Sequence, residues 1–248
     1  MTIFDRFKLL HDTKQPLLLN NIWDAASAAL VQANGATALA TSSASLAWAL
    51  GYADGSHLPI DELLNAIKRI QKIATIPLSV DIEDGYSSNP IEVANLVKSI
   101  ASLGVVGINI EDGAGPAELL TVKIKAIRES VGNELFINAR TDVYLRAIAE
   151  GEVAFNMAIE RLNTYQHAGS NGGFIPGLSD TVIVKRLSNS TSLPINIMVN
   201  DLEVDVPRFE HSKIARFSVG PSSFVDAYRH LVKPNPELDY NRINNLFL

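Results

Sequence analysis

The amino-acid sequence predicts a single (β/α)8 barrel domain over residues 1–248, with an extra helical segment at its C-terminus. Eight short apolar runs recur along the chain, and most are followed by a segment whose apolar residues have helical spacing. The length of 248 residues agrees, because barrels of this kind typically have about 250 residues. A doubly wound sheet is the main alternative. It predicts fewer strands and a glycine-rich phosphate loop after the first strand, where this chain has Asn-Asn-Ile-Trp-Asp at residues 20–24.

The eight predicted strands are short and rich in valine, isoleucine and leucine. They lie at residues 17–20, 36–40, a run that begins at 78, 105–110, 135–139, 172–177, 195–199 and 214–219. The predicted helices lie at residues 25–33, 61–74, 90–103, 119–130, 152–168 and 180–188, followed by a short irregular helix and a helix that ends at 231. Asp24 and Asp61 are suitable N-caps, and Gly35 and Gly104 end the helices before them.

Composition and charge exclude several classes of function. The chain carries a net charge of −6 and no basic run longer than two residues, which argues against nucleic acid and anionic membranes as partners. The N-terminus is charged where a signal peptide needs an apolar run, and five serines and threonines interrupt the most apolar segment, Ala36–Leu50. Cysteine is absent, which excludes disulfides, thiolate metal sites and a cysteine nucleophile. We therefore expect a cytoplasmic protein.

Three acidic residues follow the third predicted strand. Asp81, Glu83 and Asp84 lie directly after an apolar run and precede Gly85. In an alternating strand Asp81 and Glu83 point to the same side. Carboxylates at the mouth of a buried strand repel one another unless a cation or hydrogen-bond donors neutralise them, and Mg²⁺ is the cation that prefers such oxygen ligands. The alternative is a solvated acidic loop.

The same arrangement recurs after other predicted strands. Glu111-Asp112-Gly113 follows the fourth strand, and Arg140 follows the fifth. Because the carboxyl ends of barrel strands converge on one face, where barrel enzymes carry their active sites, these side chains are expected to meet there. The predicted cluster contains Ser42, Ser43, Asp81, Glu83, Glu111, Asn138 and Arg140.

Seven motifs together resemble the isocitrate lyase/phosphoenolpyruvate mutase superfamily. They extend over nearly the whole chain, at residues 20–27, 41–44, 50–55, 81–86, 107–113, 137–142 and 218–221. The resemblance implies a barrel enzyme that makes or breaks a C–C bond, or less commonly a P–C bond, beside an α-oxo or α-hydroxy carboxylate. An enolate stabilised by Mg²⁺, with Mn²⁺ as the other candidate metal, carries this chemistry in the superfamily.

The resemblance also implies metal-site and catalytic residues. Asp81 matches the direct metal ligand, and Glu83 and Glu111 match the acids that hold the waters of the metal. Arg140 matches the guanidinium that holds substrate oxygens, and Asp54 matches an acid near the reacting group; with Glu111, these are the expected catalytic residues. Two alternatives stay open: Arg140 as a structural ion-pair partner of a neighbouring acid, and Asp54 as part of a simple turn.

Further residues are implied to bind the substrate. Ser42, Ser43 and Ala44 match the loop that binds a carboxylate or phosphonate, and Asn138 and Arg140 belong to the same expected site. Trp48 and Tyr52 are expected to shape the pocket, with packing as the alternative for both aromatic side chains. The acids beside these residues, Asp84, Asp112 and Asp142, are interpreted as orienting or capping groups.

The sequence departs from the superfamily in the loops that determine which reaction is catalysed. Isocitrate lyases carry a Lys-Lys-Cys-Gly-His loop after the fourth strand, and the mutase carries a loop with a lysine and an asparagine. Residues 111–120 contain no cysteine, lysine or asparagine. Pro176-Gly177 follows the sixth strand, where the mutase has a histidine. Two hypotheses remain: an Mg²⁺-dependent enzyme resembling oxaloacetate hydrolase or decarboxylase, and a catalytically degraded barrel that binds a small carboxylate.

The C-terminal tail, residues 234–248, lies beyond the eighth unit. Its apolar residues Leu238, Ile243, Leu246 and Phe247 form a small stripe, which predicts a segment that packs under the barrel or on a neighbouring subunit. The superfamily exchanges its last helix between subunits, so the resemblance implies a homo-oligomer, either a dimer or a tetramer.

Overall fold

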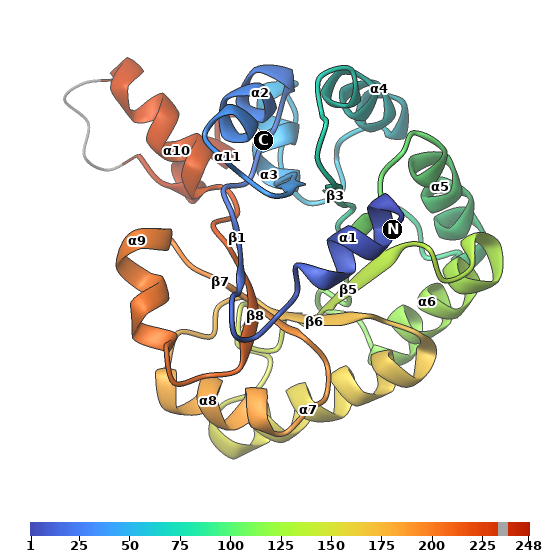
Figure 1. Cartoon of the computed structure of the whole chain (residues 1–248), viewed down its shortest axis with the longest axis vertical. Helices are drawn as coiled ribbons and strands as arrows, with labels where there is room; N and C mark the ends of the chain where they lie inside the picture. The colour runs from blue at the N-terminus through green and yellow to red at the C-terminus, as the bar shows by residue number, and fades with distance from the viewer. Residues whose placement is uncertain (233–237) are drawn as a thin grey trace.

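The structure, a computed structural model that describes residues 1–232 and 238–248, confirms the predicted barrel. Eight parallel strands form one sheet in the order β1-β8-β7-β6-β5-β4-β3-β2, with helices on the outside (Figure 1). A parallel bridge between Ile22 and Thr41 joins the two ends of the sheet just beyond β1 and β2. The barrel is therefore nearly closed, and the carboxyl ends of its strands surround a common opening.

The elements follow one another as strand and helix in most of the chain. The strands are β1 Leu17–Leu19, β2 Leu39–Ala40, β3 Leu78–Asp81, β4 Gly107–Glu111, β5 Phe136–Arg140, β6 Gly172–Ile175, β7 Ile195–Met198 and β8 Ile214–Ser218. The helices are α1 Ile3–Leu9, α2 Ala25–Ala33, α3 Ser43–Ala49, α4 Ile60–Gln71, α5 Pro90–Ser102, α6 Ala117–Val131, α7 Gly151–Ala168, α8 Thr181–Asn189, α9 Leu202–Asp205, α10 Ser222–Arg229 and α11 Tyr240–Asn244. Short 3-10 segments cover Val206–Phe209 and His230–Val232.

The clearest differences from the sequence-based expectation concern three helices. Helix α1 was not predicted, and neither was α3, which begins directly after β2 where we expected only the end of a strand. Helix α4 begins at Ile60, with the extended residue Pro59 as its N-cap, so Asp61 is not the cap. Asp61 lies instead in the first turn, where a negative charge interacts favourably with the helix dipole.

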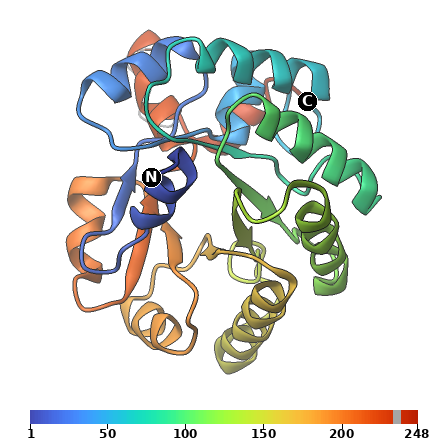
Figure 2. The ribbon, with the colours of Figure 1, turned by 45° about the vertical axis from the view of Figure 1, so that its right-hand side comes forward.

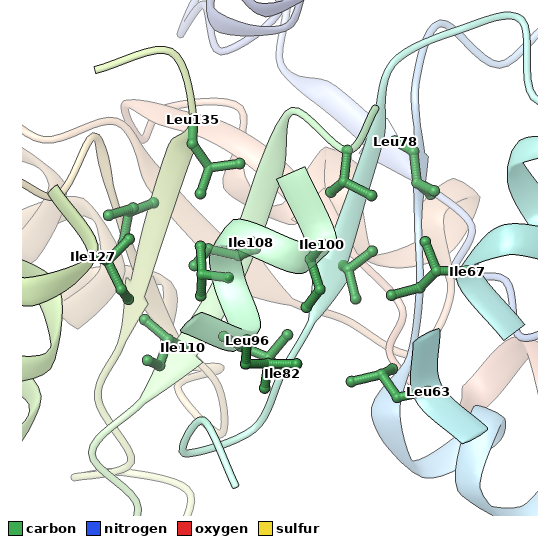
Figure 3. Packing of buried hydrophobic residues seen from close by; sticks show 14 of the residues in the cluster. Leu63, Ile67, Leu78, Ile82, Leu96, Ile100, Ile108, Ile110, Ile127 and Leu135 are labelled. Atoms are coloured by element: carbon green, nitrogen blue, oxygen red, sulfur yellow. The ribbon is translucent and has the colours of Figure 1, made fainter. Parts of the chain in front are cut away.

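The main hydrophobic core lies between the strands β3 to β5 and the helices α4 to α6. Figure 3 shows Leu96 and Ile100 of α5, one turn apart, beside Ile108 of β4. Leu63 and Ile67 of α4, also one turn apart, lie toward β3 in the same cluster. All five side chains are buried. The i, i+4 spacing therefore explains both why these segments are helical and which face they turn to the barrel.

Helix α1 lies across the amino-terminal end of the barrel (Figure 2). Its first turn is closed by a capping box between Thr2 and Asp5. Phe7 is fully buried with its ring edge-on to Phe136 at the start of β5, and the ring of His11 contacts both, stacking on the Phe136 ring with the two ring centres 4.0 Å apart. Because α1 covers this end, the opposite end is the one that is accessible for binding.

The C-terminal segment packs beside the helices that follow β1 and β2 (Figure 1). Ile243 of α11 joins a small core with Trp48 of α3 and Phe224 of α10. The predicted additional helix is therefore present at Tyr240–Asn244, whereas the first part of the predicted tail, residues 234–237, lies outside the described residues. Within the described part of the chain, no helix is both long enough and apolar enough to cross a membrane.

Candidate active site at the carboxyl end of the barrel

A cavity of about 900 Å³ opens at the carboxyl ends of the strands. Eight of the residues expected from the sequence line it: Ser42, Ser43, Ala44, Asp54, Asp81, Glu83, Glu111 and Arg140. They come from β3, β4, β5 and the segments after β2, so parallel strand order brings together residues that are far apart in the sequence.

Asp81 and Glu83 reach the cavity through a turn. Strand β3 ends at Asp81, and Glu83 then adopts a left-handed backbone with a φ of 51°. The Glu83 amide donates a hydrogen bond to Asp81 Oδ1 at 3.1 Å, which stabilises this turn. Both carboxylates line the cavity as expected, but the alternation of a regular strand ends before Glu83. A left-handed non-glycine residue costs conformational energy, which is typical of functional sites.

Neutral donors hold the Glu83 carboxylate. The Tyr86 hydroxyl donates to Glu83 Oε1 at 3.1 Å, and the Ser56 hydroxyl donates to Oε2 at 3.1 Å, with the Ser56 amide as a further donor. Burial, together with the negative charges of Asp54 and Asp81, raises the pKa of Glu83 to about 7. Glu83 thus lies in a site that favours an additional positive charge.

Asp81 is the carboxylate at the centre of the cluster. Burial raises its pKa, and the nearby charge of Arg140 and the hydrogen bond from the Glu83 amide act in the opposite direction. The charge of Asp54 raises the pKa further. A second arginine, Arg216 of β8, is fully buried, and the charge of Asp81 acts on it as well. Arg216 was not predicted, because nothing in the sequence distinguishes a buried arginine within a strand.

Arg140 forms two ion pairs at the end of β5. Its Nη1 lies 2.7 Å from Glu111 Oε2, and its Nε lies 2.6 Å from Asp142 Oδ1. The ion pairs considered as the alternative for Arg140 are therefore present, and the residue also lines the cavity. Burial raises the pKa of Glu111, whereas the two carboxylates raise that of Arg140 against the effect of its own burial.

The acids beside the site orient its elements, as interpreted from the sequence. Asp112 accepts hydrogen bonds from the Asp142 amide at 2.9 Å, from Arg161 at 2.8 Å and from the Tyr165 hydroxyl at 2.6 Å. These contacts join the ends of β4 and β5 to α7. Asp142 in turn contacts Arg146, whose Nε lies 2.9 Å from Asp142 Oδ2. Asp142 also pairs with Arg140, and Arg140 pairs with Glu111, so this network holds the Arg140 and Glu111 side chains in place.

The three carboxylates of Asp81, Glu83 and Glu111 differ in whether they are free to bind a divalent cation directly. Among the described residues, no group of three or more histidine, aspartate and glutamate side chains is arranged to hold a metal directly. Glu83 is engaged by Tyr86 and Ser56, and Glu111 by Arg140. Neither Asp81 nor Glu83 forms an ion pair among the described residues, and only Glu83 is held by hydroxyl donors. The site therefore fits Mg²⁺ with Asp81 as one direct carboxylate and water as the remaining ligands.

Three expected substrate-binding residues lie outside the cavity lining. Trp48 is buried against Phe224 behind the cavity, because α3 turns its indole toward α10. Tyr52 packs against the edge of the main core. Asn138 is fully buried deeper in the barrel and donates to Asn109 Oδ1 at 3.0 Å. Its neighbour Asn109 lines the cavity, and the substrate-binding role of Trp48, Tyr52 and Asn138 stays a prediction.

The segment after β4 is short. It consists of residues 112–116, because α6 begins at Ala117, and the Gly115 amide closes it by donating to the Asp112 carbonyl at 2.8 Å. A side chain added at Gly113 would lie 3.9 Å from Nη2 of Arg146. Arg146 therefore stands beside this short segment at the rim of the cavity, a position that the sequence did not indicate.

Asp54 lies in the loop between α3 and α4, residues 50–59, together with Ser56. Both Asp54 and Tyr240 of α11 line the cavity, and the Tyr240 hydroxyl donates to Asp54 Oδ2 at 2.7 Å. Sequence reasoning missed Tyr240, since it considered the tail only as an apolar stripe. The local signal available in the sequence was Asp239, a suitable N-cap, which indicates that a helix begins at Tyr240.

The sequence and the fold of the chain are similar to those of known proteins. A sequence profile of the family described as Phosphoenolpyruvate phosphomutase matches residues 7–237. The 2-methylisocitrate lyase of Escherichia coli K12 is 28% identical over 198 residues, which cover 76% of this chain and 67% of the lyase.

Two solved structures are similar to the chain. A proposed phosphonomutase from Burkholderia cenocepacia has a TM-score of 0.87 and 34% identity, covering 92% of this chain and 96% of that protein. A phosphonopyruvate hydrolase in complex with oxalate and Mg²⁺ has a TM-score of 0.80 and 19% identity. The match covers 93% of this chain and 84% of that protein. The second similarity supports the fold alone.

Proposed function

Because this chain belongs to the phosphoenolpyruvate phosphomutase family, we propose that it is an Mg²⁺-dependent enzyme acting on a small α-oxo or α-hydroxy carboxylate. The family profile is that of a phosphomutase, and the relative from Escherichia coli is a 2-methylisocitrate lyase. The reaction that we propose makes or breaks a C–C bond, with P–C chemistry as the less favoured form, and proceeds through an enolate. The observation that carries the proposal is Asp81, with Glu83 and Glu111, beside Arg140 in one cavity.

Different residues of the chain would bind the metal and the substrate. When bound, Mg²⁺ would act as a Lewis acid for the negative charge that develops on the substrate. Asp81 would hold the metal directly, while Glu83 and Glu111 would hold its waters. Arg140, fixed by Glu111 and Asp142, would attract the substrate carboxylate with a guanidinium that is already oriented.

The start of α3 would bind one end of the substrate. Residues 42–44 line the cavity at the beginning of this helix, and Ser42 is its N-cap. The serine hydroxyls and the backbone N–H groups of residues 42–44 are donors of the kind that bind a carboxylate. Asp54 would exchange a proton with the reacting carbon, since it lines the same cavity as Asp81 and Glu83. Its charge is close enough to raise the pKa of both acids.

The choice among reactions is supported by what the segment after β4 contains. Residues 112–116 are short and carry no cysteine, lysine or asparagine. An oxaloacetate hydrolase-like or decarboxylase-like reaction therefore suits the chain better than isocitrate cleavage or phosphonate rearrangement. The same short segment favours the second candidate, a barrel that binds a small carboxylate without turnover. We also propose Mn²⁺ as the alternative metal, a homo-oligomeric assembly and a cytoplasmic location.

Thermal unfolding in the presence of oxalate tests the site, because oxalate is a planar mimic of the enolate of pyruvate. A ligand that binds only the folded state at about 100 times its Kd adds about 2.7 kcal/mol of stability. For a chain of this size we expect Tm to rise by roughly 5 °C or more. The rise should require Mg²⁺ and should be lost in Asp81→Asn and in Arg140→Lys, which keeps the charge but loses the planar fork.

Matched variants control for indirect effects. Asp61→Asn and Arg69→Lys change the same residue types at exposed positions of α4 and should retain the full rise. If millimolar oxalate with Mg²⁺ gives no rise in the unaltered protein, the proposed enolate site is wrong. If oxalate binds but oxaloacetate and substituted malates are not turned over, the binding barrel without turnover becomes the better assignment.

A further inference from the structure

Helix α11 contacts the proposed proton-transfer residue directly. The Tyr240 hydroxyl donates to Asp54 Oδ2 at 2.7 Å, across 186 positions of the sequence. The other carboxylate oxygen, Oδ1, is buried and accepts no hydrogen bond from the described residues. One oxygen of Asp54 is thus held by Tyr240, while the second is not engaged by a donor.

A second residue of the same helix face holds the backbone of this loop. Asn244 lies one turn after Tyr240, and its Oδ1 accepts from the Asp54 amide at 2.7 Å and from the Trp48 indole at 2.8 Å. The Trp48 ring is buried and also lies 5.3 Å from the Tyr240 ring. Helix α11 is therefore fixed to α3 and to Asp54 at the same time, through residues at i and i+4.

The electrostatic surroundings explain why a neutral donor is suited to this position. Asp54 lies close enough to Asp81 and Glu83 for its charge to raise the pKa of both. Burial and the charge of Asp54 raise the pKa of Tyr240, so the hydroxyl keeps its proton and remains a donor. The other end of the loop is tied to the site through Ser56, whose hydroxyl donates to Glu83.

We propose that Tyr240 is a positioning residue for Asp54, which makes helix α11 a necessary part of the active site. The inference rests on the proposed function, in which Asp54 exchanges a proton with the reacting carbon. In that step the C3 proton of a pyruvate-like substrate passes to Oδ1, the C–H electron pair becomes the enolate, and Asp54 becomes a carboxylic acid. The reverse step returns a proton to C3. Tyr240 restricts rotation of the carboxylate, so that Oδ1 keeps one orientation throughout.

Exchange of the methyl protons of pyruvate for deuterium tests the inference without knowledge of the natural substrate. The protein is incubated with Mg²⁺ and saturating pyruvate in D₂O, and the methyl signal is followed by NMR. Tyr240→Phe removes only the hydroxyl of a side chain that is 39% exposed, so the fold should be retained. We expect the exchange rate to fall by about 10- to 100-fold, as for a misplaced general base, with the oxalate Kd unchanged.

Two further variants separate positioning from general damage. Asn244→Leu breaks the contact with the Asp54 amide and should slow exchange in the same direction, also without weakening oxalate binding. Tyr228→Phe removes a hydroxyl from an aromatic residue that stacks on Phe224, and should exchange at the unaltered rate. Tm is recorded for every sample, so that a loss of folded protein is recognised as such.

Each outcome has a separate meaning. An unaltered exchange rate in Tyr240→Phe overturns the inference while leaving the proposed function in place. Equal losses in exchange and in oxalate binding also overturn it, because they indicate a structural role. An unaltered protein that binds oxalate with Mg²⁺ but exchanges no protons overturns the role of Asp54 and with it that of Tyr240. If oxalate does not bind at all, the proposed function itself fails.

Discussion

At the residue scale, the acids around the cavity differ in how their charge is compensated. Asp142 lies against Arg140 and Arg146, and Asp112 lies against Arg161. Asp81 has no such direct partner among the described ion pairs, although it lies at the centre of the cluster. Buried carboxylates without a partner carry a desolvation cost that structural acids avoid. This contrast between neighbouring acids is the residue-level argument for a cation at Asp81.

His11 gives a prediction for stability as a function of pH. Its Nδ1 lies 3.0 Å from the Phe7 carbonyl, and burial together with the charge of Arg216 lowers its pKa from 6.5 to about 3. The unfolded chain therefore binds the proton more readily than the folded protein. Stability should be complete above about pH 6.5 and fall as the pH is lowered, by roughly 1–2 kcal/mol between pH 7 and pH 5.

Denaturant unfolding at several pH values measures this dependence. In His11→Phe the contribution should vanish, so that the difference in unfolding free energy between pH 7 and pH 5 becomes smaller than in the unaltered protein. His167→Phe is the matched control, because His167 lies on the exposed side of α7 and should leave the dependence unchanged. The same slope in His11→Phe and in the unaltered protein would contradict the prediction.

The site residues that could be predicted from sequence are those that follow a strand directly. Asp81, Glu111 and Arg140 were found because the strands β3, β4 and β5 are apolar and end at a change to charge. Tyr240 could not be found in this way. Its partner Asp54 lies 186 positions away, and the contact exists only because α11 packs on α3. Local patterns contain no information about such a contact.

At the element scale, helix α1 acts as the cover of the amino-terminal end of the barrel. The sequence did not reveal it, because α1 has only seven residues and buries a single side chain, Phe7. A segment this short shows too little periodicity for a reliable prediction. Gly107 of β4 provides the space for that side chain, since a Cβ there would lie 2.6 Å from the Phe7 ring.

Replacing Phe7 tests how much helix α1 contributes to the free energy of unfolding. Phe7→Ala removes a fully buried aromatic ring and leaves a cavity between α1 and β5, so we expect the unfolding free energy to fall by about 3–5 kcal/mol. Ile3→Ala changes a half-exposed apolar side chain of the same helix and should cost far less. Urea unfolding of both variants measures the difference. Similar small effects would indicate that α1 is not tightly packed.

At the scale of the whole molecule, the repeat of strand and helix was sufficient to predict the barrel. Eight apolar runs at regular spacing identify eight strands, and parallel pairing then fixes their order without knowledge of the side-chain contacts. What could not be predicted is helix α1 and the contacts that place α1 and α11 on the barrel. Helices α1 and α11 lie outside the repeat, and both are positioned by packing against residues distant in the sequence.

The exposed apolar residues near the C-terminus lead to the last prediction, which concerns assembly. Leu231, Leu246 and Leu248 are 75%, 76% and 81% exposed, which is unfavourable for side chains of this type unless another surface covers them. We therefore expect a native mass that is a multiple of 26.9 kDa, either a dimer or a tetramer, when measured by light scattering after gel filtration. Leu246→Glu combined with Leu248→Glu should lower that mass, because charge would have to be buried in the interface. Leu30→Glu, at an equally exposed leucine of α2, should leave it unchanged. A monomeric mass for the unaltered protein would show that these leucines remain in water, and the assembly implied by the family resemblance would then be wrong for this chain.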